Sequence, residues 1–403
     1  MNSFSTTKVV LRCRPWVVRA LGTAFAGAVL FPMLALGQAA NAKNPHGFSF
    51  IHDELDDGPV SVRVFKVARS SPDWDLVTTL GGGATFGMSV VSEQVRAMPA
   101  EWGHPVAAIN GDFYDMSRDY PGDPEGLTIS RGELWSGPCA TRACFYLDAQ
   151  GNPHRTNIVS RFKVTWPNGA TTSFGLNEYR ASDEAVLYTT VVGHSTRTYG
   201  GREFILERQT NSPWLPLQVG KTYSARVRAV REGGNSPLTR DTLVLSLGSR
   251  LATALPTLPV GATIQVSTAT LPDITGATVA IGGGPSLVSG GKAKVAGFLD
   301  MRHPRSAVGW SKDHLFLVQV DGRQRHSVGM TYSELAHYMI KKLGCQEALN
   351  LDGGGSATIW VYGQVVNNPS QGRQRPSANA LVVVLKKKPG SPPQTAGNAG
   401  GSK

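Results

Sequence analysis

The sequence lacks the short motifs that mark several large classes of enzyme. None of its nine histidines forms an HExxH motif, and no CxxC pair occurs among its four cysteines. The segment GGGPSLVSGGKA does not fit a phosphate-binding P-loop, because Ser286 stands where the motif needs glycine and Ala293 where it needs Ser or Thr. GGSAT is not a nucleophile elbow, because Thr358 stands in place of the final glycine. Zinc-protease, redox and NTPase interpretations therefore lack support.

The body of the chain also lacks the basic excess of a nucleic-acid-binding protein. The formal net charge is +11, but four basic groups without an acid lie in residues 1–42 and four more lie in residues 386–403. The remaining residues carry a net charge of only +3. We therefore expect no nucleic-acid partner. The tail 386–403 is rich in Pro, Gly and Ser and is predicted to be disordered.

Residues 1–42 predict an export signal. A basic segment from Lys8 to Arg19 precedes an apolar core, and Ala40–Ala42 fits an A-x-A cleavage site. The alternative is an uncleaved signal anchor, since the apolar run approaches the length that spans a bilayer. Cleavage is the preferred interpretation. It predicts a periplasmic or secreted protein that starts at Lys43 and has no stable membrane span.

Cysteines are few, and two of them are close in sequence. Cys139 and Cys144 lie in GPCATRACF, near enough to close a small loop. In an exported protein this spacing favours a disulfide, and we predict one here. Cys345 is left over between a predicted helix and a predicted strand, so we expect a buried free thiol.

Helical periodicity is scarce, and strand patterns are common. The 46 glycines and 25 prolines indicate many turns, and 41% hydrophobic content suffices for a large core. Residues 155–270 contain many short strands with turn signals, which indicates an inserted β-rich subdomain. We predict a mixed α/β (α+β) fold with a central mixed β-sheet and helices, in one domain over residues 43–385.

The most informative unit covers residues 315–362. LFLVQV is nearly all apolar, which is typical of a strand buried on both faces. TYSE matches a capping box at Thr331 and Glu334, and a helix and the strand ALNL follow. This β-α-β order predicts parallel strands, with Asp321 and Asp352 at the same sheet edge. The two would start roughly 5 Å apart on neighbouring strands, or roughly 10 Å apart if one strand intervenes.

The segment LDGGGS follows the second of these strands. A plain turn needs one glycine, so a turn suffices for Asp321-Gly322 but not for three glycines after Asp352. Glycines let the backbone approach a ligand closely and turn N–H groups toward an anion. Together with Arg323, the two acids and the loop predict a sugar or phosphate site.

A second polar cluster lies in NGDFYDMSRDYPGDPEG. Asn110 and Asp112 directly follow an apolar strand, so we expect them at the same edge as the other acids. The remaining acids suit a solvated surface loop, and their spacing does not match an EF-hand. The sequence predicts no required cofactor and leaves Ca²⁺ as an alternative. The surface-loop interpretation applies to Asp119 and Asp123; the cluster also holds Asp115 and Glu125.

Several motifs occur together, in order, over most of residues 47–385. They are AINGDFYD, AIGGGPSLVSGG, HPRSAVGW, LVQVDGRQ, GMTYSELAHYMIKKLG, ALNLDGGGSAT and NNPSQGRQRPSANAL. As an ordered set they resemble the phosphodiester glycosidase family, which includes N-acetylglucosamine-1-phosphodiester α-N-acetylglucosaminidase and many exported bacterial proteins. The family often has glycine where Asp112 stands, which weighs against an obligate catalytic role for this residue.

The resemblance implies hydrolysis of a sugar-1-phosphodiester at the sugar–oxygen bond, in an envelope or extracellular glycan. The preferred acid at the reacting carbon is Asp352, with Asp321 as its partner. Two alternatives stay open: a metal-dependent phosphodiesterase that cuts the P–O bond, and a non-catalytic glycan-binding or polysaccharide-assembly protein. The resemblance implies catalytic roles for Asn110, Asp112, Asp321 and Asp352, and substrate binding by Arg305, Arg323, Arg375, Gly353, Gly354, Gly355 and Ser356.

Overall fold

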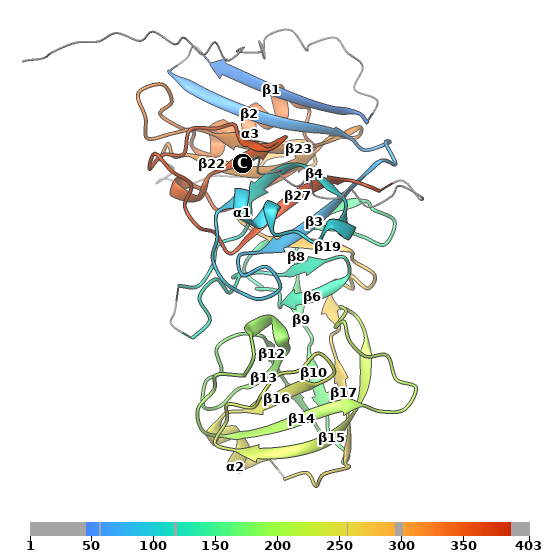
Figure 1. Ribbon diagram of the computed structural model, residues 1–403. Coiled ribbons are helices and arrows are strands. Elements are labelled where there is room, and N and C mark those ends of the chain that lie inside the picture. The colour runs from blue at the N-terminus through green and yellow to red at the C-terminus, as the bar shows by residue number, and fades with distance from the viewer. Residues whose placement is uncertain (1–45, 56–57, 117–118, 256, 295–300, 388–403) are drawn as a thin grey trace, which may run out of the picture. The chain divides into compact units, whose positions relative to one another are not determined.

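The computed structural model describes residues 46–387, apart from residues 56–57, 117–118, 256 and 295–300. The predicted export signal and residues 388–403 of the predicted tail lie outside the described residues. Strands dominate the described part of the chain and helices are few, which confirms the predicted β-rich mixed fold (Figure 1).

The largest sheet of the main body has seven strands, and every neighbouring pair in it is antiparallel. The central strands come from the C-terminal half of the chain, and the N-terminal hairpin β1–β2 extends one side. In spatial order the strands are β1 (Phe48–Leu55), β2 (Val60–Ala68), β23 (His314–Val320), β22 (Arg305–Trp310), β24 (Glu347–Asn350), β20 (Ser286–Ser289) and β21 (Lys292–Ala293).

The predicted β-α-β unit is present in this sheet. Helix α3 (Tyr332–Lys341) begins with the predicted capping box, in which Thr331 accepts from the Glu334 amide while Glu334 accepts from the Thr331 amide. Strands β23 and β24 each pair antiparallel with β22, so they run parallel to one another with one strand between them. The larger of the two predicted separations, roughly 10 Å, therefore applies.

A five-stranded sheet faces the seven-stranded one. Apolar side chains from both sheets, such as Leu317, Ile109 and Leu381, form one cluster and are fully buried. Each such side chain contributes about 1.5–3 kcal/mol through removal from water. In spatial order the strands of this sheet are β26 (Gln364–Val365), β25 (Ile359–Val361), β4 (His104–Asn110), β27 (Asn379–Leu385) and β3 (Trp74–Leu80).

Helices cover the outer faces of these two sheets. Helix α3 packs on the seven-stranded sheet, where Leu335 and Met339 are fully buried. The short helix α1 (Val91–Arg96) packs on the five-stranded sheet through Val91 and Val95. No helix among the described residues is long and apolar enough to cross a membrane. The 3₁₀ helices are η1 (Ala100–Trp102), η2 (Thr190–Val192) and η3 (Gly354–Ser356).

A third sheet of the main body has five strands and borders the inserted region. Its apolar residues share a core with the inserted strands, as Ile129 and Phe204 illustrate. A two-stranded ribbon joins the two regions, formed by β9 (Val159–Ser160) and β18 (Thr270–Leu271). In spatial order the five strands are β6 (Glu133–Ser136), β5 (Thr128–Ser130), β19 (Val279–Gly282), β7 (Ala143–Leu147) and β8 (Pro153–Asn157).

The inserted β-rich region forms an eight-stranded sheet of its own, drawn in green to yellow in Figure 1. Helix α2 (Ser249–Ala254) follows its strand β16. In spatial order the strands are β11 (Thr171–Ser173), β10 (Lys163–Thr165), β17 (Thr263–Ser267), β15 (Thr222–Glu232), β14 (Arg202–Arg208), β16 (Leu243–Leu247), β13 (Ala185–Tyr188) and β12 (Gly175–Leu176).

Candidate active site

Three strand ends of the seven-stranded sheet meet at one edge. Strand β23 ends just before Asp321, and β24 ends two residues before Asp352. Strand β22 lies between them and starts at Arg305, which pairs with Val320 at the end of β23. Because β22 runs in the opposite direction, its first residue lies beside the last residues of its neighbours. Three predicted site residues therefore share this edge.

Asn110 joins this edge to the five-stranded sheet. It ends β4, is fully buried, and its Nδ2 donates to the backbone oxygen of Asp352 at 2.6 Å. Its Oδ1 accepts from Ser306 Oγ at 2.6 Å and from the Thr358 amide at 3.0 Å. The Asp352 amide donates to Gly111 O at 2.9 Å. The Asn110 side chain is thus fully occupied in connecting the two sheets.

Asp352 lies beside an arginine at the surface of this edge. Its Oδ2 accepts from Arg375 Nη2 at 3.1 Å, and Arg375 Nε donates to Ser356 Oγ at 2.9 Å. Burial raises the pKa of the Asp352 carboxyl, while Ser356 and Arg375 act in the opposite direction. The Asp352 side chain is 12% exposed and the Arg375 side chain 38%, so the pair is accessible to solvent mainly on the arginine side.

The three glycines after this aspartate lie close to neighbouring groups or have a backbone conformation that favours glycine. Gly354 has φ 58°, in the left-handed region that favours glycine. A Cβ at Gly353 would lie 2.7 Å from Pro304 O, and one at Gly355 would lie 3.1 Å from Gln371 Nε2. Close backbone packing therefore explains Gly353 and the left-handed conformation explains Gly354, whereas Gly355 lies against the side chain of Gln371.

The amides of this loop are partly used within the protein. The Gly354 amide donates to Pro304 O at 2.9 Å, and the Ser356 amide donates to Gly353 O at 3.1 Å within η3. These two N–H groups do not face a ligand, in contrast to the sequence-based expectation. Ser356 meets the candidate site through its hydroxyl instead.

Asp321 lies in a different environment from Asp352. Its side chain is fully buried, and its Oδ2 accepts from Arg63 Nη1 at 2.7 Å. Its Oδ1 accepts from the Asn368 amide and from Gln319 Nε2, both at 3.1 Å, while its backbone oxygen accepts from Ser327 Oγ at 2.6 Å. No hydrogen bond among the described residues joins it to the second aspartate.

Arg323 overlies the glycine loop. Its φ is 61°, an uncommon value for a residue with a side chain, and such strain costs roughly 1–3 kcal/mol. Its Nη2 lies 3.3 Å from His303 Nδ1. A Cβ at Gly354 would lie 3.2 Å from the same Nη2. The exposed guanidinium is thus held directly above the loop that follows Asp352.

Arg305 is buried and engaged by its neighbours. Its Nε donates to Met330 O at 2.9 Å, and its Nη2 donates to Met301 O at 2.8 Å. The guanidinium carbon lies 3.7 Å from the centre of the Tyr332 ring. Only 5% of the residue is exposed. Arg305 shares the edge but holds the segment 301–332 in place.

Asp112 carries a buried carboxyl oxygen without a partner. Its Oδ1 accepts from the Phe113 amide at 2.8 Å and from Arg142 Nη2 at 3.0 Å, whereas Oδ2 has no hydrogen bond among the described residues. A side chain at Gly126 or Gly282 would collide with Oδ2. Burial raises the pKa of Asp112 to about 7, with Arg142 acting in the opposite direction.

The acidic loop adds a second carboxyl of this type. Burial, together with the charges of Glu178, Asp115 and Asp112, raises the pKa of Asp123 to about 8. Among the described residues, no group of three or more His, Cys, Asp or Glu side chains is arranged to hold a metal ion. Calcium binding by this loop stays the alternative to the prediction of no required cofactor, and experiment must decide between them.

The predicted disulfide is wrong: Cys139 and Cys144 are free thiols. Cys144 lies within β7, is 3% exposed, and its Sγ lies 3.6 Å from Thr156 O. Cys139 lies in the preceding loop and contacts Thr141 Oγ1 at 3.3 Å. The strand pairing of β7 turns Cys144 into a core, where burial raises its pKa to about 12. Cys345 is a buried free thiol, as predicted.

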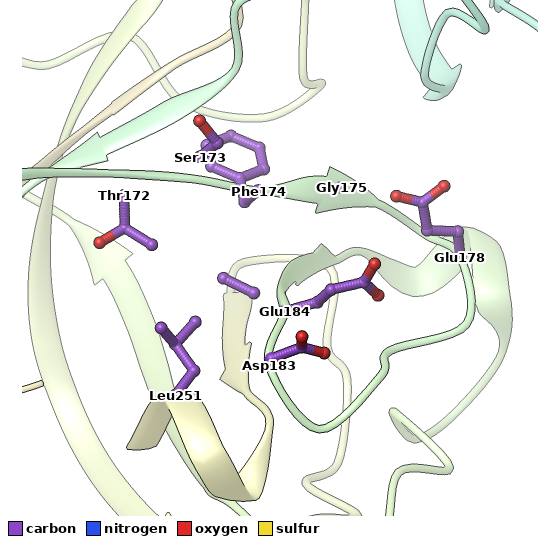
Figure 2. A pocket seen from close by; sticks show the side chains of 9 residues that line it. Thr172, Ser173, Phe174, Gly175, Glu178, Asp183, Glu184 and Leu251 are labelled. Carbon is purple, nitrogen blue, oxygen red and sulfur yellow. The ribbon is translucent and has the colours of Figure 1, made fainter. Parts of the chain in front are cut away.

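A separate pocket of about 340 Å³ lies in the inserted region, away from every predicted site residue. Glu178, Asp183 and Glu184 stand at one side of it and Leu251 at another (Figure 2). Burial raises the pKa of Glu178 to about 7, with the charge of Glu184 adding to it. These acids have no role in the edge that holds Asp352.

Sequence reasoning missed two arginines that hold the predicted acids. Arg63 pairs with Asp321 across 258 positions of sequence, and Arg142 pairs with Asp112. Arg63 stands between two valines in strand β2 and is 6% exposed. A buried arginine needs an acidic partner, so its place in that strand was a usable signal. Nothing in the sequence around Arg142 pointed to its partner.

Comparison with known proteins gives this edge a family context. A family model described as phosphodiester glycosidase matches residues 223–384. The predicted family resemblance is confirmed. Asn110 and Asp112 precede the matched segment. The predicted site residues within it are Arg305, Asp321, Arg323, Asp352, Gly353, Gly354, Gly355, Ser356 and Arg375.

A curated relative matches a shorter segment. The SPbeta prophage-derived uncharacterized protein YomE of Bacillus subtilis is 37% identical over 86 residues, which is 21% of this chain. The match covers only 13% of the length of that protein. This relative therefore adds similarity in sequence and no known activity.

Solved structures share the fold. A hypothetical protein from Synechocystis has a TM-score of 0.65 at 21% identity, covering 84% of this chain and 62% of that one. A protein of Burkholderia pseudomallei named as a candidate exported protein has a TM-score of 0.61 at 21% identity, covering 81% and 74%. The zebrafish N-acetylglucosamine-1-phosphodiester α-N-acetylglucosaminidase catalytic domain has a TM-score of only 0.40 at 17% identity, covering 86% of each chain. The Synechocystis and Burkholderia structures therefore establish the fold and not the substrate.

Proposed function

We propose that this phosphodiester glycosidase relative hydrolyses a sugar-1-phosphodiester by breaking the bond between sugar C1 and the phosphate oxygen. The observation that carries this proposal is the partly exposed Asp352–Arg375 pair inside the segment that matches the family model. A carboxylate suits the positive charge that develops at C1, and a guanidinium suits the phosphate that leaves. The two charges stand side by side, as cleavage of such a bond requires.

Asp352 is the proposed acid at the reacting carbon. It either attacks C1 itself or removes the proton of an attacking water; these two routes give retention or inversion at C1. In both, the electron pair of the C1–O bond passes to the phosphate oxygen, and water supplies the hydroxyl of the free sugar. Because a phosphomonoester is already a good leaving group, protonation of the departing oxygen is not needed.

Arg375 and Arg323 are the proposed phosphate-binding residues. Arginine presents a planar set of donors that matches phosphate oxygens. Both guanidinium groups reach solvent beside the glycine loop, Arg375 through Ser356 and Arg323 above Gly354. Arg305 differs because its donors are occupied by Met330 and other neighbours, so we assign it a positioning role.

Asp321 and Asn110 are proposed as positioning residues rather than catalytic ones. Both are buried, and the side chain of each forms several hydrogen bonds. Asp321 fixes the turn that carries Arg323, since its backbone oxygen accepts from Ser327 Oγ within that turn. Asn110 fixes the backbone of Asp352. This division of roles sharpens the sequence-based hypothesis, in which Asp321 was the chemical partner of Asp352.

The proposed substrate is a phosphate-linked glycan of the cell envelope or the extracellular space. The export signal predicted in residues 1–42 supports this location, as does the name of the similar Burkholderia structure. We propose no required metal; addition of a chelator should therefore leave turnover unchanged. Loss of turnover that Ca²⁺ restores would contradict this part of the proposal.

Hydrolysis in ¹⁸O-water tests the reaction. A GlcNAc-1-phosphodiester is incubated with wild type and with Asp352→Asn, and the products are analysed by mass spectrometry. The proposal expects label on the sugar, lost in the variant. The matched control is Asp313→Asn, an exposed acid in the turn at the opposite end of the β22–β23 hairpin.

Other outcomes select other functions. Label on the phosphate would identify a phosphodiesterase and overturn the mechanism. Binding of the compound without turnover would favour a glycan-binding protein, and in that case Asp352→Asn would leave binding intact. Anomeric analysis of the first product by NMR then separates retention from inversion.

A further inference from the structure

A second cavity lies against the outer side of the five-stranded sheet that contains β3, β4 and β27. Its volume is about 550 Å³, within the usual range for small-molecule sites. The wall includes the end of β3, helix α1 and the loop after it, and residues 189–191 of the inserted region. Trp102 and Trp135 are among the residues that line it, and we call it the Trp102 pocket. None of the predicted site residues lines it.

Two tryptophans give this pocket an aromatic surface. The rings of Trp102 and Trp135 are stacked with their centres 6.4 Å apart and an interplanar angle of 28°. Trp135 is 5% exposed, whereas Trp102 is only partly buried and so presents ring surface to the cavity. Sugar rings carry C–H groups on their faces, and these pack well on flat aromatic surfaces.

Polar groups complete the lining. Burial raises the pKa of Glu133, with a hydrogen bond to Trp135 acting in the opposite direction. Arg240 is exposed, and its guanidinium forms no hydrogen bond or ion pair with any described residue. A carboxyl can bind sugar hydroxyls, and a free guanidinium favours a ligand with negative charge. An aromatic wall with both groups matches an anionic saccharide better than an apolar ligand.

The pocket lies near the edge that holds Asp352. Leu80, at the end of β3, lines the pocket and pairs with Asn379 at the start of β27. The next strand is β4, which ends at Asn110, the residue bonded to Asp352. Two strand spacings, roughly 10 Å, therefore separate the β3 and β4 ends. A glycan of several units can extend over this distance.

A hydrogen-bonded path also connects the pocket wall to the Arg375 loop. Gln94 lines the pocket and donates to Ser377 O at 2.8 Å. Gln374 exchanges hydrogen bonds with Ser92 of the same helix α1, at 2.8 and 3.2 Å. Arg375, the arginine that pairs with Asp352, lies between Gln374 and Ser377 in the chain. The pocket and the candidate site are thus built on one segment.

We propose that the Trp102 pocket is a subsite for a further saccharide unit of the substrate, so that the substrate is an anionic oligosaccharide or polysaccharide with phosphate linkages. This inference rests on the proposed function. The sugar ring packs on Trp102, its hydroxyls reach Glu133, and a phosphate of the chain reaches Arg240. The Asp352 site cleaves, and the pocket selects for chain length.

Comparison of a short and a long substrate tests this inference. The short probe is N-acetylglucosamine 1-(methyl phosphate), and the long probe is a tetramer of phosphate-linked N-acetylglucosamine. In Trp102→Ala and in Arg240→Ala we expect KM for the tetramer to rise about tenfold, which corresponds to about 1.4 kcal/mol. The kcat for the tetramer and both constants for the short probe should stay within about twofold of wild type.

Matched controls separate the pocket from general effects. Tyr179→Ala removes an aromatic ring that is 61% exposed outside the pocket, and Arg231→Ala removes an exposed arginine of β15. Neither should alter KM for the tetramer. Because Arg240 is at the surface, its variant keeps the test decisive if Trp102→Ala folds poorly. Equal changes for both probes, or no change for the tetramer, would overturn the inference.

Calorimetric binding keeps this test independent of hydrolysis. If neither probe is hydrolysed, the proposed function fails, and binding of the tetramer to the full chain is measured by titration. Binding about tenfold weaker in Trp102→Ala and Arg240→Ala than in the controls supports the saccharide subsite. Equal binding in all variants, or binding of the short probe as tight as the tetramer, overturns it.

Discussion

Asp321 and Asp352 look alike in the sequence and differ in the structure. Each closely follows an apolar strand, each precedes glycine, and the two strands are parallel with one strand between them. Asp321 is nevertheless enclosed and paired with Arg63, whereas Asp352 reaches solvent beside Arg375. The position of an acid at the end of a strand thus identifies the sheet edge that holds the candidate site. The groups around the acid then determine whether it supports the structure or takes part in the reaction.

The largest expected effect is on activity at Asp352. We expect Asp352→Asn to lower kcat about 10²–10⁴-fold, because the carboxylate at the reacting carbon is lost. Its thermal unfolding midpoint should stay near that of wild type, since asparagine has nearly the same shape as aspartate and its oxygen can still accept from Arg375. Initial rates and calorimetry measure the two quantities. Activity within about tenfold of wild type would mean that a residue other than Asp352 acts at the reacting carbon.

For Asp321 we expect the opposite pattern, with stability as the main loss. Asp321→Ala leaves the buried Arg63 without its partner, which typically costs about 3–5 kcal/mol. Urea denaturation measures the free energy of unfolding. The double variant Arg63→Met, Asp321→Leu removes both charges and should recover much of this loss. A loss below about 1 kcal/mol in the single variant would mean that the pair contributes little.

Substitution of Arg375 should shift the pH dependence of turnover. Its charge and hydrogen bond lower the pKa of Asp352 against the effect of burial, so Arg375→Gln lets that pKa rise. Because the ionised carboxylate is the active form, the acid limb of the pH–kcat profile should move to higher pH. We also expect kcat to fall about 100-fold through loss of a phosphate-binding group. An acid limb that stays at the same pH would mean that Arg375 does not influence the pKa of Asp352.

The raised pKa values of Asp112 and Asp123 predict that the free energy of unfolding depends on pH. Burial raises their pKa values to about 7 and about 8, so the folded protein holds their protons more tightly than the unfolded chain. Their contribution is fully present below about pH 4 and is lost as the pH rises to 7–8. Asp112→Asn should reduce this fall, as denaturant titrations at several pH values will measure. An equal fall in wild type and variant would mean that Asp112 does not titrate in this range.

The smallest expected effect comes from Gly354. Gly354→Ala forces a side chain into the left-handed region at φ 58°, which costs about 1–2 kcal/mol. The added Cβ would also lie against Arg323, so KM should rise. Gly363→Ala is the control, because Gly363 has φ 95° but no atom within 4 Å of an added Cβ. Equal KM values in the two variants would contradict a role for the loop in substrate binding.

Local patterns predicted local structure well. The capping box at Thr331 and Glu334, the buried strand before Asp321 and the common edge of both aspartates all follow from residues close in sequence. The ion pair of Arg63 with Asp321 joins residues 258 positions apart, and periodicity carries no information about such pairs. The disulfide prediction failed for the same reason: spacing along the chain did not reveal that pairing of β7 buries Cys144.

The contacts around Asn110 have a consequence for how this site can change during evolution. Because the Asp352 backbone is bonded in both directions to the end of β4, the two facing sheets cannot slide past each other without breaking the site. We therefore expect differences in substrate to arise in loops around the site, such as 371–377, and not in the sheets. Those loops are free to diverge between lineages, so related proteins can acquire new sugars while the cleaving residues keep their places.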